Sequence, residues 1–264
     1  MSESGYSSDE SFNEKEYYQT ELERFKKKYE IISRISSGNG QVFNGIEKNQ
    51  NIPVVIKKLQ KKKSGIPNEV TFHKKAQSAS SGVIRLLEVF ELKKSVILIL
   101  EKPENSMDLL EIINQFGVLT DQIAFEIIQK VAIICQELEN VGICHRDIKD
   151  ENILFDPVTF EIKLIDFGSA TMWRDVYQDD AGTSAFHPPE FYKTGYMQAA
   201  GLTSWSLGCL YYILLTGTCP FSPENPDFKL RLSSIQCHFY SKIILSKLLA
   251  PEGERIHFSY LLSL

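Results

Sequence analysis

The segment HRDIKDEN, residues 145–152, and the tripeptide DFG, residues 166–168, decide the fold of this chain. Each segment adjoins a short apolar run, so its polar side chains stand at the end of a predicted strand. The carboxylate of Asp147 can accept the proton of an attacking hydroxyl group, and Lys149 can neutralise charge on a transferring phosphoryl group. The two segments in this order predict a phosphoryl-transfer site. The alternative interpretation is a charged surface turn followed by a loop cap at Asp166.

Length and charge narrow the class of protein. The chain has 264 residues, of which 43% are hydrophobic, enough for a large core in one two-lobed domain or in two ordinary domains. This content excludes a wholly disordered chain. The net charge of −5 gives no support to nucleic-acid binding, because proteins that bind nucleic acids are usually basic. We expect a monomer that acts on protein partners and does not bind nucleic acid.

The cysteines and the apolar segments bear on the compartment. The five cysteines are scattered without a CxxC pair, which favours free thiols in a reducing compartment over a disulfide framework or a zinc site. Residues 1–20 are polar and acidic, unlike a secretory signal. The longest apolar stretch, residues 207–215, is too short to span a bilayer. We therefore expect an intracellular protein, in the cytoplasm or the nucleus, with no membrane association.

Apolar patterning divides the chain into a tail and two parts. Residues 1–22 are rich in Ser, Glu and Asp and predict a disordered tail, and residues 23–264 form the folded domain. Residues 23–101 predict a sheet with one helix, residues 101–105 a Pro-containing hinge, and residues 106–264 a mainly helical part. The expected helices cover residues 67–77, 108–115 and 120–139, the last capped by Thr120 or Asp121.

The nucleotide half of the site is expected in the strand-rich part. Gly38 and Gly40 precede Val42 in a hairpin, where backbone amides can approach phosphates without obstruction by side chains. The loop is one residue short, and a serine stands at its first glycine position. Lys57 ends an apolar strand, and Glu69 lies on the next predicted helix. This arrangement predicts an ion pair that holds the lysine against the α- and β-phosphates of ATP.

Two residues are candidates for metal binding. Asn152 and Asp166 carry amide and carboxylate oxygens, which are the ligands that Mg²⁺ prefers. Their positions predict that they hold the magnesium ions that bridge the phosphates of ATP.

The segment after DFG supplies further candidates. Thr183 is expected to hydrogen-bond Asp147 and Lys149 and so to brace the catalytic loop. The tripeptide PPE, residues 188–190, stands where such a segment closes, and Arg255 is spaced to pair with its glutamate. The alternative for the arginine is a solvated surface residue.

These motifs resemble those of the PIM family of Ser/Thr protein kinases, in the branch related to calmodulin-dependent kinases. The resemblance extends from about residue 29 to residue 261 and includes SGVIRLL (81–87), LILEKPE (98–104), KLIDFGS (163–169) and WSLG (205–208). It implies an α+β, bilobal protein kinase fold, with a small antiparallel β-sheet N-lobe plus one helix and a larger, mainly helical C-lobe. It also implies that ATP and Mg²⁺ bind in the cleft between the lobes. The implied nucleotide-binding residues are Gly38, Gly40, Val42, Val55, Lys57, Glu69, Leu100, Glu101, Leu154 and Asp166.

The hinge carries the diagnostic residue of this resemblance. Pro103 matches the hinge proline of PIM kinases, and proline has no N–H, which implies one fewer backbone hydrogen bond to adenine. Leu100 is the implied gatekeeper. The carbonyl of Glu101 is the implied acceptor for the adenine amino group.

The resemblance implies substrates with several basic residues before the Ser/Thr. Asp108, Glu111 and Glu151, with Glu224, are acidic at positions that read those basic residues, whereas Thr218 stands where the family has an aspartate. We therefore expect a basophilic specificity that is weaker or altered. Each exposed pair contributes only about 0.2–1 kcal/mol.

The activation segment is acidic. It carries Asp175, Asp179 and Asp180, which are expected to pair with Arg146 without phosphorylation. Because PIM kinases are active without activation-loop phosphorylation, the resemblance implies constitutive activity.

Departures from the general pattern leave alternatives open. Thr203 occupies the place of an aspartate that anchors the catalytic loop in most kinases, a departure that the PIM family shares. The shortened glycine loop favours a second hypothesis, a pseudokinase scaffold that binds nucleotide or partners without efficient transfer. A small-molecule phosphotransferase is a third, but it should lack the PPE element and the late arginine.

Overall fold

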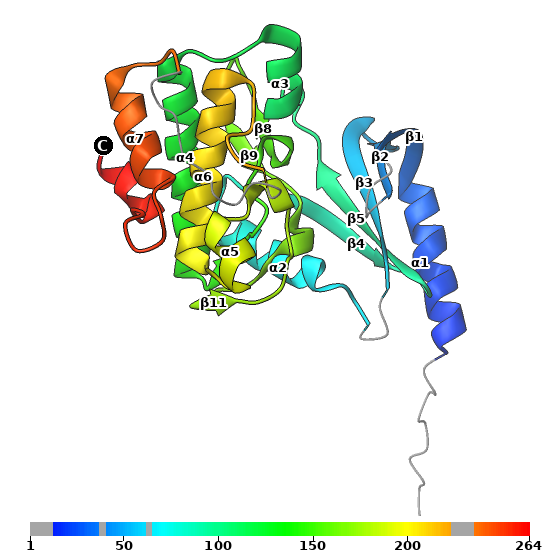
Figure 1. Ribbon diagram of the computed structural model, residues 1–264. Helices are drawn as coiled ribbons and strands as arrows, with labels where there is room; N and C mark the ends of the chain where they lie inside the picture. Colours follow the sequence, from blue (N-terminus) through cyan, green and yellow to red (C-terminus); the bar gives the residue numbers. More distant parts are fainter. Residues whose placement is uncertain (1–12, 37–40, 62–64, 223–234) are drawn as a thin grey trace, which may run out of the picture. The chain divides into compact units, whose positions relative to one another are not determined.

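The computed structural model describes residues 13–36, 41–61, 65–222 and 235–264. The chain forms two compact units. The first contains residues 1–67 and 86–102, and the second contains residues 68–85 and 103–264. The expected combination of an antiparallel sheet and a mainly helical part is confirmed (Figure 1).

The first unit is built on one antiparallel sheet of five strands in the order β1-β2-β3-β5-β4. The strands are β1 (Tyr29–Ser36), β2 (Gln41–Glu47), β3 (Ile52–Gln60), β4 (Leu86–Glu91) and β5 (Ser95–Glu101). The β-branched runs of β3 and β5 suit a pleated, buried surface. Val54, Ile56, Phe90 and Ile99 form the core of one face, together with Phe25 from the preceding helix.

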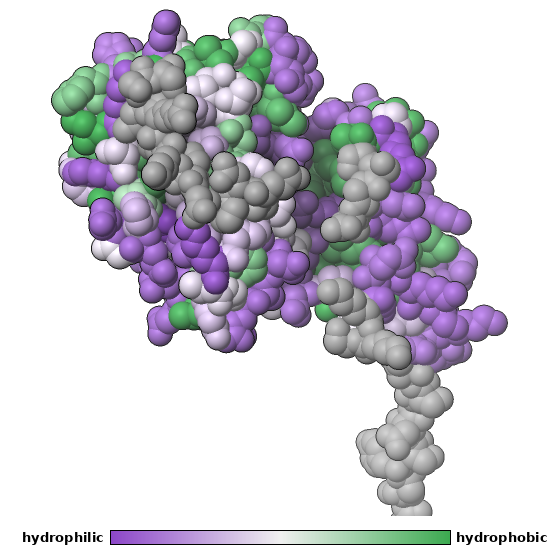
Figure 2. All heavy atoms as spheres, viewed as in Figure 1, coloured by the Kyte–Doolittle hydropathy of each residue, from purple (hydrophilic) through white to green (hydrophobic). Residues whose placement is uncertain are grey.

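That preceding helix, α1 (Glu14–Lys28), corrects the expected disordered tail. The tail was expected to reach residue 22, but helix α1 already begins at Glu14, where Asn13 caps it by accepting from the N–H of Glu16. Charged side chains make its exposed face hydrophilic (Figure 2), so composition alone resembles disorder. Tertiary packing decides otherwise, because the ring of Phe25 is buried and meets Phe90 edge to face at 5.5 Å.

Glu88 on β4 fastens the C-terminal end of α1. Its carboxylate accepts hydrogen bonds from Lys28 Nζ at 2.7 Å, Arg24 Nη2 at 2.8 Å and the Tyr29 hydroxyl at 2.9 Å. Burial by itself raises the pKa of Glu88, but these three donors outweigh it and lower the pKa below its ordinary value.

We expect Glu88→Gln to loosen α1 from the sheet. The lowered pKa means that the contribution of Glu88 is complete above its ordinary pKa of 4.5 and is lost as the pH falls further through the folded-state value. Hydrogen exchange of the α1 amides checks both statements: their protection, relative to an unstructured peptide at the same pH, should fall in the variant at pH 7 and in the wild type below about pH 4.5. Glu30→Gln, which removes the same charge from an exposed site on β1, is the control and should leave exchange unchanged.

The second unit is a helical core that carries three small sheets. Helices α4 (Asp121–Asn140), α6 (Ala199–Thr216) and α7 (Phe239–Leu248) pack side by side (Figure 1). Thr120 caps α4 by accepting from the N–H of Ile123, as expected. Among the described residues, the other α-helices of this unit are α2 (Asn68–Ala79), α3 (Leu109–Phe116) and α5 (Pro189–Thr194).

Helix α6 is apolar along its whole length. By length and composition it could cross a membrane, but 78% of its span is buried inside the unit, which is typical of a core helix. Trp205, Leu207 and Tyr211 are among its buried side chains, and the hydroxyl of Tyr211 donates to Ser241 on α7. The sequence predicted that the apolar stretch of residues 207–215 is too short to span a bilayer. That stretch is only part of α6, which runs from Ala199 to Thr216.

The helix α2 packs with the second unit, whereas the sequence placed it with the sheet. The buried imidazole of His73 stacks on Phe167 with ring centroids 4.9 Å apart, and its Nε2–H donates to the carbonyl of Ile84. Val83 forms a bridge with Leu164. These contacts explain why residues 68–85 cluster with the helical unit.

Short strand pairs position the loops of the second unit. The three sheets are β6-β8-β9, β7-β10 and β11-β12. Their strands are β6 (Met107–Asp108), β7 (Ile143–Cys144), β8 (Ile153–Phe155), β9 (Ile162–Leu164), β10 (Thr171–Met172), β11 (Val176–Tyr177) and β12 (Met197–Gln198). The loop between β7 and β8 and the loop after β9 carry the two segments that the sequence singled out.

Candidate active site

The loop after β7 turns sharply at Arg146. Arg146 adopts the left-handed backbone region, with φ of 65°, which is strained for a side chain of this size. The preceding His145 is buried, and its Nε2–H donates to the carbonyl of Ile165 at 3.0 Å. The backbone N–H of Asp147 in turn donates to His145 Nδ1 at 3.3 Å. The histidine therefore ties the loop to the strand end that leads into DFG.

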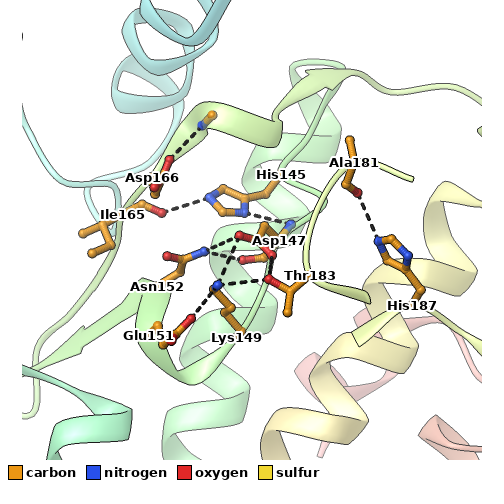
Figure 3. Close-up of polar contacts among 11 residues, drawn as sticks. His145, Asp147, Lys149, Glu151, Asn152, Ile165, Asp166, Ala181, Thr183 and His187 are labelled. Carbon is orange, nitrogen blue, oxygen red and sulfur yellow. Dashed lines mark hydrogen bonds and ion pairs between the residues drawn. The ribbon is translucent and has the colours of Figure 1, made fainter. Parts of the chain in front are cut away.

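Three polar side chains surround the carboxylate of Asp147 (Figure 3). Thr183 donates its hydroxyl proton to Asp147 Oδ1 at 2.7 Å and accepts from Lys149 Nζ at 3.0 Å. Asn152 donates to Asp147 Oδ2 at 2.9 Å and to the Asp147 carbonyl at 2.8 Å. The expected hydrogen bonds of Thr183 are thus present. Both carboxylate oxygens of Asp147 are held in fixed directions.

Lys149 stays charged in this setting. Burial lowers its pKa, but the hydrogen bond with Glu151 and the charges of Asp147 and Asp166 more than compensate, so the pKa is raised overall. Its Nζ lies 2.5 Å from Glu151 Oε2 and 3.7 Å from Asp147 Oδ2. The ammonium group is therefore available to meet negative charge beside Asp147.

Asp166 stands at a second strained position. Its φ is 61°, and its Oδ1 accepts from the N–H of Gly168 at 3.0 Å, which caps the short 3₁₀-helix of residues Phe167–Ser169. The side chain of Phe167 is fully buried against His73 and His145. This anchoring turns the exposed Asp166 away from the core.

The donor set fits Mg²⁺. Because Asn152 uses its amide nitrogen toward Asp147, its Oδ1 remains as an oxygen ligand. Asp166 adds a carboxylate, and hard oxygen ligands are those that Mg²⁺ takes. Within the described part of the chain, no cluster of three or more His, Cys, Asp or Glu side chains forms a separate metal site.

In the first unit, four of the predicted nucleotide residues share one face of the sheet. Val42 lies opposite Lys57, and Val55 lies opposite Leu100. Directly paired residues of an antiparallel sheet point to the same side, and Val55 and Lys57 are two positions apart on β3. These side chains therefore line one face of the sheet. Glu101, which pairs with Val54, points to the opposite face.

The remaining predicted nucleotide residues are placed as follows. Gly38 and Gly40 lie outside the described residues. Leu154 is half-buried in β8. Lys57 is buried in the first unit, and Glu69 is buried in the second, where its carboxylate lies beside Gly168. The ion pair expected between these two residues stays a prediction.

The end of the activation segment is fixed by Arg255. Its guanidinium pairs with Glu190 through two hydrogen bonds, of 2.5 and 3.0 Å, and also donates to the carbonyl oxygens of Gly201 and Ala250. The arginine side chain is only 3% exposed, so the alternative of a solvated surface residue is wrong. Such a bidentate, buried pair is geometrically specific.

The protein kinase domain family model matches residues 29–256. The chain belongs to the protein kinase family. The Ser/Thr-protein kinase pim-2 of Danio rerio is 33% identical over 238 residues, which is 80% of this chain and 77% of the relative. The two units accordingly form the bilobal kinase fold, and the chain is a Ser/Thr protein kinase by its relatives.

Two further relatives match a smaller share of their own length. The Ser/Thr-protein kinase prk-2 of Caenorhabditis elegans is 31% identical over 213 residues, which is 76% of this chain and 48% of the relative. The Ser/Thr-protein kinase 1 of African swine fever virus is 38% identical over 169 residues, which is 63% of this chain and 55% of the relative. This kinase thus spans about half the length of each.

The sequence missed two histidines of the kinase site. His145 was quoted only as part of a motif, yet it connects the catalytic loop to Ile165. His187 was not singled out at all, although it is 1% exposed and hydrogen-bonds the activation segment. The only sequence signal for His187 was its place directly before PPE. That place does not indicate a role until its contact with the Ala181 carbonyl is known.

Proposed function

We propose that this chain is a kinase of the PIM group that transfers the γ-phosphoryl group of ATP to Ser or Thr in basic peptide contexts. The observation that carries the proposal is the arrangement around Asp147, where Thr183, Lys149 and Asn152 hold a carboxylate beside a charged ammonium group. The hinge Pro103 and the 33% identity to pim-2 support the PIM group.

The proposed chemistry assigns one task to each side chain. Asp147 accepts the proton of the substrate hydroxyl, since each of its oxygens keeps a further lone pair while Asn152 and Thr183 fix its direction. Lys149 neutralises the charge that develops on the transferring group. Lys57 holds the α- and β-phosphates, and Glu69 orients it.

Asn152 and Asp166 are the proposed metal ligands. The ion that these two residues would hold would neutralise negative charge on the phosphate groups of ATP. The hydrogen bond from Asn152 to Asp147 couples the metal ligand to the general base, so the two groups are positioned together.

Substrate selection is proposed to rest on acidic side chains of the helical unit. Asp108 caps α3 by accepting from the N–H of Glu111, whose own carboxylate accepts from Gln115. Glu151 is 52% exposed while it pairs with Lys149. Glu224 lies outside the described residues, and Thr218 is exposed without adding negative charge. The proposed preference for basic residues is accordingly modest.

Constitutive activity is the second element of the proposal. Arg146 Nη1 lies 2.5 Å from Asp179 Oδ1, its Nε donates to the carbonyl of Ser169, and its guanidinium lies over the ring of Tyr177. Asp179 therefore already forms the ion pair with Arg146 that a phosphorylated residue of the activation segment would otherwise form.

We expect Asp179→Asn to lower turnover by roughly twofold to fivefold, because Asp179 is 60% exposed and solvent screens the pair. Steady-state rates with a peptide substrate check this result, with Asp175→Asn as the control of equal charge. Loss of activity in dephosphorylated wild-type enzyme, with recovery on phosphorylation of Ser184 or Tyr177, would contradict constitutive activity.

The first experiment measures transfer from radiolabelled ATP with magnesium to an arginine-rich Ser/Thr peptide library. Asp166→Asn is the control. Transfer that is lost in the control supports a basophilic kinase and gives its consensus. No transfer, with nucleotide still raising the melting temperature, supports the pseudokinase scaffold instead.

A further inference from the structure

His187 lies at the end of the activation segment, next to the catalytic loop. Its Nε2–H donates to the carbonyl of Ala181 at 3.2 Å (Figure 3), which closes the six-residue path between them. The ring meets Phe191 edge to face at 5.2 Å and lies near Tyr192. The side chain is 1% exposed, and among the described residues its Nδ1 has no hydrogen-bond partner.

The turn held by this contact leads directly to the site. Gly182, with φ of 108°, follows Ala181, and a Cβ at this position would clash with the carbonyl oxygen of Arg146. The activation segment and the catalytic loop therefore touch backbone to backbone at Gly182. The next residue, Thr183, bridges Asp147 and Lys149. A shift of the Ala181 carbonyl is thus transmitted to the Asp147 carboxylate over two residues.

Other carbonyls of the segment are held by different groups. Ser184 accepts from Tyr192, and Phe186 accepts from Ser206 on α6. On the N-terminal side of the turn, where Thr183 is presented, Asp179 Oδ1 accepts from the N–H of Ala181 at 3.2 Å, and His187 holds the carbonyl of the same residue.

We infer that His187 is a positioning residue for phosphoryl transfer: its neutral imidazole clamps the carbonyl of Ala181 and fixes the turn that presents Thr183 to Asp147 and Lys149. The inference deepens the proposed function and rests on it. The clamp needs one ring N–H as donor and a second ring nitrogen that carries no proton, since a buried N–H at Nδ1 would have no acceptor.

The surroundings favour this neutral form. Burial is the largest effect and lowers the pKa of His187 below its ordinary value of 6.5. The bond to Ala181 and the charges of Asp147 and Asp180 act in the opposite direction, and Arg146 adds to the lowering. The neutral imidazole is therefore favoured at pH 7. A protonated ring could still donate from Nε2, but it would bury a charge and a second N–H without an acceptor, so we expect acid to displace it from the Ala181 carbonyl.

Two substitutions separate the donor from the bulk of the ring. His187→Phe keeps a ring without a donor, whereas His187→Gln keeps an amide N–H near the position of Nε2. With magnesium-ATP and an arginine-rich peptide, His187→Phe should lower kcat by about three- to tenfold, the value of one hydrogen bond, with KM for ATP unchanged. His187→Gln should restore most of kcat. Below pH 6.5 the ratio of the Gln variant's kcat to the wild-type kcat should rise.

Hydrogen exchange of residues 181–187 supplies a readout without catalysis. Exchange should quicken in His187→Phe and stay near the wild-type rate in His187→Gln. If His187→Phe does not fold, His187→Leu takes its place. Equal kcat in the Phe variant and the wild type, or an equal loss in the Phe and Gln variants, overturns the positioning role. A wild type that transfers no phosphate refutes the proposed function. In that case, hydrogen exchange of residues 181–187 in the two variants still tests whether His187 holds the turn.

Discussion

Replacing Asp147 by Asn is expected to lower turnover by about 10²- to 10⁴-fold, the usual contribution of a general base. Thr183 and Asn152 donate to different oxygens of the carboxylate, and asparagine would turn an NH₂ group, which is a donor, toward one of them. The substitution thus removes the proton acceptor and also disturbs its support. Single-turnover rates with a peptide substrate and saturating magnesium-ATP measure the effect.

Nucleotide affinity distinguishes a chemical role of Asp147 from a structural one. ATP affinity should change little in Asp147→Asn, because the phosphates are assigned to Lys57 and the metal ligands. Asp156→Asn is a suitable control, since Asp156 caps an exposed turn after β8. A large loss of ATP binding in Asp147→Asn, with the control unaffected, would mean that Asp147 holds the loop together instead.

Replacing Arg255 by Met is expected to lower the free energy of unfolding of the helical unit by about 3–5 kcal/mol. The loss arises because Glu190, whose side chain is only 10% exposed, would keep a charge without its partner. The carbonyl oxygens of Gly201 and Ala250 would also lose their donor. Tryptophan fluorescence in urea measures the change, because both tryptophans, Trp173 and Trp205, lie in this unit.

A double variant tests the origin of that loss. Glu190→Leu combined with Arg255→Met removes both charges, and it should recover much of the stability that Arg255→Met loses. Lys193→Met, a cation on the last turn of α5, is the control for loss of positive charge. If the double variant were no more stable than Arg255→Met, the stacking of the guanidinium over the ring of Trp205 would be the main contribution, rather than the unpaired glutamate.

Local chemistry explains why much of the fold was predictable. The β-branched run of β3, the continuous apolar run of β5 and the Thr120 cap of α4 are encoded by neighbouring residues, and the structure forms two strands and a helix there. The segments around Asp147 and Asp166 were recognisable for the same reason. Their function requires fixed residue types at fixed spacing on two adjacent strand ends.

Long-range packing explains the failures. Helix α1 is too polar to be predicted from its composition, and it is ordered because Phe25 meets Phe90 and because Glu88 collects three donors. The grouping of α2 with the helical unit likewise depends on the stacking of His73 on Phe167. In both cases the deciding partner lies far away in the sequence.

The sequence by itself determined the family, the catalytic segments and most secondary structure, because these depend on residue type and local spacing. Only the tertiary structure decided that Asp179, of the three aspartates in the activation segment, pairs with Arg146, and that His187 holds the Ala181 carbonyl. Each of these contacts joins segments whose distance is set by the packing of α6 and its neighbours. A hydrogen bond needs that distance to within a few tenths of an ångström, and the order of residues along a chain does not specify it.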